Sequence, residues 1–129
     1  MISFNMEGIV GAEKLYDLDK CFRWDKISFL NSFCYAIERD DNSNLRSVLL
    51  LCLIYRNNNK EHEIKVRFSD VTNLNLRRIG GECNQLLGFE ISDKINDGWE
   101  PERRFYVCDY ENDVVSFSCS SFEVISVSL

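Results

Sequence analysis

The sequence has few of the residues on which common catalytic mechanisms depend. Its 129 residues include one histidine, His62, and one proline. Acid–base and nucleophilic catalysis usually pass through a histidine that a partner orients in a cleft. His62 lies instead on the apolar side of an alternating segment, so we expect a hydrogen-bonded or edge histidine rather than a catalytic one. The phosphate-loop patterns GxxxxGKS/T and GxGxxG are also missing, and no nucleotide loop is predicted.

Basic charge and long apolar runs are also scarce. The chain has 15 Lys and Arg against 21 Asp and Glu, a net charge of −6. Nucleic acids and anionic lipids are bound by basic surfaces, so we expect neither partner. The longest apolar run, Val48–Tyr55, is far shorter than the about twenty residues of a membrane span. Residues 1–10 contain no signal-peptide pattern, and we expect a cytoplasmic protein.

The cysteines do not form a recognisable metal or disulfide pattern. None of them has the CxxC spacing of a zinc site, and several lie inside apolar runs such as Leu51–Leu53. Buried, reduced thiols are the expectation for such positions in a cytoplasmic protein. We therefore predict no metal and no cofactor. The six are Cys21, Cys34, Cys52, Cys83, Cys108 and Cys119.

Length and periodicity predict one β-rich domain over residues 1–129. Leu15, Leu18 and Phe22 have helical spacing and predict a short helix within residues 9–23. Period-two patterns follow, and residues 70–84 are expected to be an irregular connection. The predicted strands are 27–37 with a kink near Asn31, 48–55, 61–68, 86–95, 105–108, 114–119 and 122–127.

These elements define the predicted fold class, α+β. We expect one short N-terminal helix, followed by a mostly antiparallel meander of about six to seven strands curled into a sandwich or half-barrel. The turn between the second and third strands is predicted at residues 57–60, because asparagine tolerates the left-handed backbone of tight hairpins.

Two acidic segments are candidates for function. Asp109, Glu111 and Asp113 alternate along the chain, a spacing that would bring three carboxylates to one edge of a strand and suit a hard cation. Metal sites normally recruit several segments, so a charged hairpin end is the simpler interpretation. The second segment contains Asp93, Asp97, Glu100 and Glu102. A glycosidase-like carboxylate pair stays open, because spacing does not give separation in space.

A loop tryptophan lies beside the second acidic segment. Trp99 is flanked by charges of both signs, as interface anchors often are. Alternatively, Trp99 folds back onto the core. An acidic surface also steers association with a basic partner. The candidate partner-binding residues are Asp93, Asp97, Trp99, Glu100, Asp109, Glu111 and Asp113.

Several segments of the chain are similar to a group of small bacterial domains. The relevant stretches are Val66–Val71, Leu74–Leu76, Gly88–Ile91, Gly98–Glu100, Tyr106–Glu111 and Ser116–Cys119. Over about residues 27–127 they resemble immunity proteins of polymorphic-toxin and contact-dependent inhibition systems. The resemblance implies a non-enzymatic cytoplasmic protein that binds and neutralises a cognate toxin domain. It carries no contact residue over to this chain.

Two other functions remain open at this point. A small-ligand-binding β-domain would use a cavity inside the curled sheet, with Tyr35, Tyr55, Tyr106 and Tyr110 as lining residues, although aromatic packing explains them equally well. An enzyme that depends on carboxylates is the other alternative. The protein is expected to be a monomer or a homodimer, since long apolar strands leave edges that pair.

Overall fold

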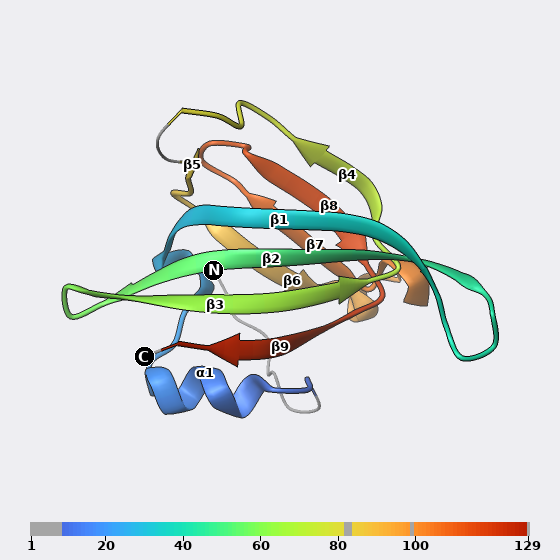
Figure 1. Cartoon of the computed structure of the whole chain (residues 1–129), viewed down its shortest axis with the longest axis horizontal. Coiled ribbons are helices and arrows are strands. Elements are labelled where there is room, and N and C mark those ends of the chain that lie inside the picture. Colours follow the sequence, from blue (N-terminus) through green and yellow to red (C-terminus); the bar gives the residue numbers. More distant parts are fainter. Residues whose placement is uncertain (1–8, 82–83, 99, 129) are drawn as a thin grey trace.

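The computed structural model describes residues 9–81, 84–98 and 100–128. In this part of the chain, two antiparallel sheets lie one over the other and a short helix runs beside one of them (Figure 1). The elements in chain order are α1 (Ala12–Leu18), η1 (Trp24–Lys26), β1 (Ile27–Arg39), β2 (Leu45–Asn57), β3 (Lys60–Ser69), β4 (Thr72–Leu76), β5 (Asn84–Gln85), β6 (Phe89–Asp93), η2 (Ile95–Asp97), η3 (Pro101–Arg103), β7 (Phe105–Asp109), β8 (Val115–Cys119) and β9 (Ser121–Val127).

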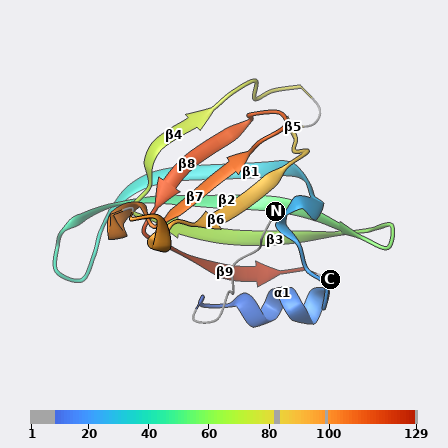
Figure 2. The same cartoon turned by 180° about the vertical axis from the view of Figure 1, so that it is seen from behind.

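The strands are divided between a five-stranded and a four-stranded sheet. The five-stranded sheet has the order β5-β1-β2-β3-β9, and the four-stranded sheet has the order β4-β8-β7-β6. Figure 2 shows the four-stranded sheet from its own side, with the five-stranded sheet behind it. The predicted, mostly antiparallel β-fold with one helix is confirmed. The described strands form two sheets and no closed barrel.

The predicted number of strands is wrong, because the described chain has nine strands rather than six to seven. The additional strands, β4 and β5, lie in the segment that was expected to be an irregular connection. β5 has two residues, and β4 has five with a register shift between Thr72 and Asn75. Asn73 inside β4 has a left-handed backbone, with φ of 56°. Such short and distorted strands leave no regular alternation to detect.

The core lies between the two sheets and is rich in aromatic rings. Phe68 of β3 packs edge-on against Phe117 of β8, with ring centroids 4.9 Å apart. Phe105 of β7 meets Phe122 of β9 edge-on at 5.1 Å. Each pair joins one sheet to the other, and edge-to-face pairs add about 0.5–1.5 kcal/mol beyond the burial of their area. These contacts fix how the sheets lie on each other.

β2 and β3 follow the sequence pattern closely. Leu49, Leu51 and Leu53 of β2 are fully buried between the sheets, and β2 is the central strand of its sheet, as predicted. The predicted hairpin turn is confirmed, because Asn58 and Asn59 have φ values of 52° and 64°. Two consecutive left-handed residues match the twist of the flanking strands.

Helix α1 is shorter than the predicted helical region of residues 9–23. Gly11 has a φ of 81°, and a Cβ atom there would lie 2.1 Å from the carbonyl oxygen of Val124. Before it, Val10 forms a parallel bridge with Glu123 of β9, so the chain is extended there rather than helical. After Leu18 the chain turns, and Asp19 accepts a hydrogen bond from the backbone N–H of Cys21. Contacts with β9 and this turn therefore define both ends of the helix.

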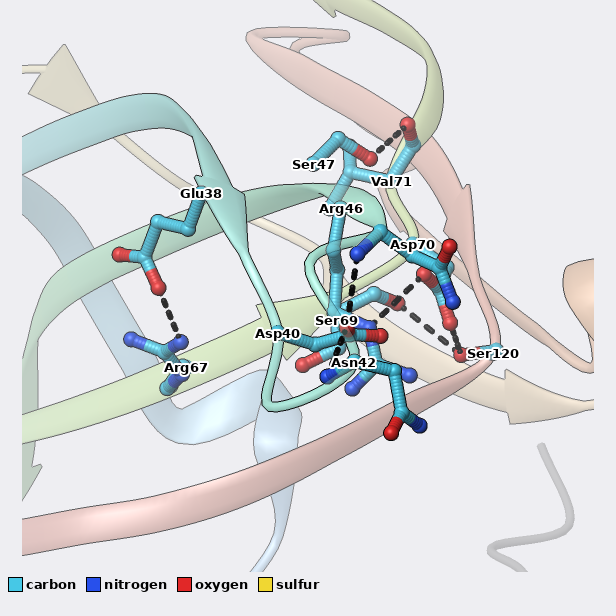
Figure 3. A network of polar contacts seen from close by, with 11 residues as sticks. Glu38, Asp40, Asn42, Arg46, Ser47, Arg67, Ser69, Asp70, Val71 and Ser120 are labelled. Atoms are coloured by element: carbon cyan, nitrogen blue, oxygen red, sulfur yellow. Dashed lines mark hydrogen bonds and ion pairs between the residues drawn. The ribbon is translucent and has the colours of Figure 1, made fainter.

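Two of the connections between the sheets, β3 to β4 and β8 to β9, meet at one corner. After β3, Asp70 adopts a φ of 58° and leads the chain into the four-stranded sheet. Ser120 brings the chain back between β8 and β9. Its backbone N–H donates to the carbonyl oxygen of Ser69 at 3.0 Å, and its hydroxyl donates to the carboxylate of Asp70. Figure 3 shows this corner, where the two crossings hold each other in place.

Candidate functional site

The predicted acidic residues are divided between the two ends of β7. Asp93 lies opposite Phe105, where β7 begins, and Asp109 is the residue with which β7 ends. β7 has five residues, so its ends are about 13 Å apart. Asp97 and Glu100 lie near the first end, whereas Glu111 lies beyond the second. The carboxylates therefore form two separate groups rather than one patch.

In the first group, Asp93 is engaged within the fold. Arg104 donates to its carboxylate from Nε at 3.1 Å and from Nη2 at 2.8 Å, and the backbone N–H of Ile95 donates as well. The Arg104 guanidinium lowers the pKa of Asp93 below its ordinary value. Asp97 and Glu100 are exposed. Trp99, the predicted anchor, lies outside the described residues. The exposed members of this group are therefore Asp97 and Glu100.

In the second group, Asp109 is completely buried. Its Oδ1 accepts hydrogen bonds from the backbone N–H groups of Leu87, at 3.1 Å, and Gly88, at 2.8 Å. Its Oδ2 has no hydrogen-bond partner among the described residues. The Asp109 side chain therefore holds the segment before β6 and does not reach the protein surface.

The other members of the second group lie in the turn after β7. Glu111 is exposed, and Asp113 pairs with Arg77 at 2.9 Å. The turn changes the direction of the chain, since Asp113 has a φ of 53°. The three alternating carboxylates therefore do not share one strand edge. Within the described ranges, no group of three His, Cys, Asp or Glu residues is arranged to hold a metal ion.

The four tyrosines considered for a ligand cavity do not gather in one place. Tyr55 is buried, and its hydroxyl donates to Asp19 at 2.7 Å. Burial, together with this bond, raises the pKa of Tyr55 far above its ordinary value. Tyr35 is exposed on β1, Tyr110 is exposed in the turn after β7, and Tyr106 is half-buried. Their positions give no support to a shared ligand pocket.

Three arginines far apart in the sequence line a surface hollow of about 360 Å³ near the corner described above. Arg46 pairs with Asp70 at 3.2 Å, and Arg67 pairs with Glu38 at 2.7 Å. Figure 3 shows both pairs. The third arginine is Arg104, which binds Asp93. Sequence reasoning missed this cluster because its members lie on β2, β3 and the segment before β7. Since each arginine already faces a carboxylate, the hollow carries little unbalanced positive charge.

An exposed apolar stripe on β1 was also missed. Phe33, Tyr35 and Ile37 are 42%, 47% and 55% exposed. The register sets Phe33 and Tyr35 opposite the buried Leu51 and Leu49 of β2, so their side chains point to the face that carries the core. Alternation correctly indicated that the three residues share a face. It did not show that this end of the face remains open.

The five described cysteines are free thiols, and the expectation that they are buried is wrong for two of them. Cys21 and Cys34 are exposed, whereas Cys52 and Cys119 are buried. Burial raises the pKa of Cys119 to about 12 and that of Cys108 to about 11. Thiols with such values are mostly protonated at neutral pH and react slowly. Neither Cys108 nor Cys119 has the lowered pKa of a catalytic nucleophile.

The comparisons with known proteins identify a family. No helix in the described ranges is long and apolar enough to cross a membrane. No curated protein and no solved structure matches the chain. The sequence model of the family described as "Immunity protein PIM8" matches residues 12–125, which include every described strand except the end of β9. The chain therefore belongs to the PIM8 family of immunity proteins.

Proposed function

We propose that this protein is a non-enzymatic inhibitor that binds a cognate bacterial toxin domain in the cytoplasm and neutralises it. The observation that carries the proposal is the family match over residues 12–125. The structure is compatible with inhibition by binding, because a rigid two-sheet framework can present a preformed surface to a partner. A protein that acts in this way blocks one toxin molecule per binding site and performs no chemistry itself.

The contact surface that we propose is acidic. Asp97 and Glu100 near one end of β7 and Glu111 near the other are exposed. In a chain with a net charge of −6, they would favour a basic toxin surface and accelerate its association. Trp99 remains a proposed contact beside Glu100. Within this proposal, Asp93, Asp109 and Asp113 support the acidic loops through their internal partners rather than by direct contact.

The test of function is rescue followed by titration. The C-terminal domain of the protein encoded immediately upstream is expressed in a test bacterium, with and without this chain. We expect the toxin domain expressed alone to stop growth, and we expect co-expression of this chain to restore growth. Adding the purified chain to the purified toxin domain should abolish activity with a sharp end point at one equivalent. Toxicity without rescue, or turnover of several toxin molecules by one chain, would contradict the proposed function.

The acidic surface is tested with two charge-matched triple variants. The first carries Asp97→Lys, Glu100→Lys and Glu111→Lys. The second reverses three other exposed acids, Glu13, Asp17 and Asp41, and so has the same net charge. We expect the first variant to slow toxin association strongly at low salt and the second to slow it weakly. Equal slowing would show that only net charge matters, and the proposed contacts would be wrong.

A further inference from the structure

Three of the four sheet edges are short or covered, and one is neither. β9 is flanked by the bridge from Val10 and by α1 (Figure 1). The edges of the four-stranded sheet are β4 and β6, with five residues each. β1 is different, because it has 13 residues, and β5 pairs only with Phe29 and Leu30. In the described chain, the stretch 31–39 of β1 therefore pairs on one side alone.

This open edge lacks the features that usually prevent strands from pairing. Proteins protect edge strands with lysine, proline, inward-pointing charge or a cover. Residues 31–37 contain no charged residue and no proline. The stretch also exposes the apolar stripe of Phe33, Tyr35 and Ile37. The register shift between Leu30 and Ser32 lies at its beginning and leaves the rest regular. Such an edge is a template for another strand.

We propose that this edge pairs antiparallel with the same edge of a second copy, giving a two-fold dimer. A register centred on Tyr35 makes the stretch self-complementary. It sets Phe33 of one copy opposite Ile37 of the other, and the two Tyr35 rings opposite each other. All three apolar side chains thereby gain apolar neighbours, which is the main source of stability between paired strands. A register centred on Cys34 would instead set Ile37 opposite Asn31.

The charges along this edge do not oppose a second copy as the occupant. Each chain carries −6, so two copies repel each other unless they meet through an uncharged surface. Residues 31–37 provide one. In the Tyr35-centred register, Glu38 lies opposite Ser32 and Arg39 lies opposite Asn31, so no like charges face each other. Since the described part of each chain offers one such edge, the pairing closes on itself and does not continue into a fibre.

The first experiment measures the mass in solution by light scattering from low micromolar to submillimolar concentration. We expect the wild-type protein to reach twice 15.1 kDa. Tyr35→Lys sets two lysines opposite each other and should raise the dimer dissociation constant by roughly tenfold or more, which corresponds to about 1.4 kcal/mol. The matched control is Tyr16→Lys, because Tyr16 is similarly exposed but lies on α1. The control should remain dimeric.

The second experiment tests the register in a Cys21→Ser background. On the other face of β1, the proposed register sets Cys34 opposite Ala36 of the second copy. Ala36→Cys should therefore give a disulfide-linked dimer on mild oxidation, and adding Cys34→Ser should abolish it. A dimer band that persists without Cys34 would overturn the proposed register.

The dimer proposal is independent of the inhibitor function. A wild-type protein that remains monomeric throughout, or a dimer unaffected by Tyr35→Lys, would overturn the dimer while leaving toxin rescue untouched. A monomer in which Tyr35→Lys abolishes toxin binding would also overturn it and assign the edge to the toxin. Conversely, if the protein is dimeric but does not restore growth in the presence of the toxin domain, the dimer proposal holds and the proposed inhibitor function is refuted.

Discussion

Replacing Asp109 is expected to damage the fold rather than a contact surface. Its carboxylate is buried at the end of β7 and accepts hydrogen bonds from the backbone N–H groups of Leu87 and Gly88. Both donors belong to the segment that leads into β6, where the backbone N–H of Tyr110 also donates to the carbonyl oxygen of Gly88 at 3.1 Å. Asp109→Ala removes the acceptor from both N–H groups, of which the bond from Gly88 is buried and the bond from Leu87 is partly buried.

The magnitude follows from these two bonds. A hydrogen bond to a charged group contributes about 1.5–3 kcal/mol, and leaving a buried donor unpaired costs about 1–3 kcal/mol. Part of this free-energy cost is recovered, because the released N–H groups can form hydrogen bonds with water. We therefore expect Asp109→Ala to lower the free energy of unfolding by about 3 kcal/mol, which in a chain of this length lowers the Tm by roughly 10 °C.

Asp109→Asn is the matched control. Its side-chain oxygen can accept the same two hydrogen bonds, and the substitution removes charge from an oxygen, Oδ2, that has no described partner. We expect a loss of less than about 1.5 kcal/mol. Urea denaturation measures the free energy of unfolding of both variants, and its dependence on urea concentration should be the same as in the wild type. An Asp109→Ala protein as stable as the wild type but unable to bind toxin would refute the reasoning, because Asp109 would then be a contact residue.

Two further predictions concern acid stability and thiol reactivity. The Tyr55 hydroxyl and the Lys26 ammonium lower the pKa of Asp19, so the stability that Asp19 contributes is present above its ordinary value of 3.8 and is lost as pH falls further. The free energy of unfolding is measured by urea denaturation at several pH values. At pH 7 the Tyr55→Phe protein should be less stable than the wild type, and this difference in free energy should shrink as the pH falls below 3.8. A difference that does not change with pH would contradict the coupling between the protonation of Asp19 and stability. In a Cys83→Ser background, we expect Ellman's reagent to label Cys21 and Cys34 rapidly and the remaining thiols only on unfolding, and a third fast thiol would contradict the burial of the others.

Local patterns predicted the parts of the fold that depend on neighbouring residues. Strict alternation along β3 located its buried side, and the asparagines at 58 and 59 located its hairpin. Neither feature requires knowledge of distant segments. The open end of β1 does require it, because alternation indicates which side chains share a face but not how far the opposite sheet extends over them. The predicted resemblance to immunity proteins is confirmed, and the family match extends it to include α1.

The candidate site was predicted less well, for a physical reason. Aspartate is usually exposed, so Asp109 was grouped with Glu111 and Asp113 by charge. A signal for its burial was present, since Asp109 continues the alternation of Phe105 and Val107, both of which point into the core. Its partners, backbone N–H groups about twenty residues earlier, leave no mark in the sequence. The arginine cluster was missed because tertiary structure alone brings its members together.

The position of β9 has a consequence for synthesis in the cell. This strand, Ser121–Val127, completes the five-stranded sheet beside β3 and also receives the bridge from Val10. During translation, the segment before α1 must therefore wait for more than a hundred further residues, and the free side of β3 for more than fifty. Domains fold as units while the chain emerges. The five-stranded sheet is thus complete only after β9 has left the ribosome, and a chain interrupted before β9 would lack the strand that pairs with β3.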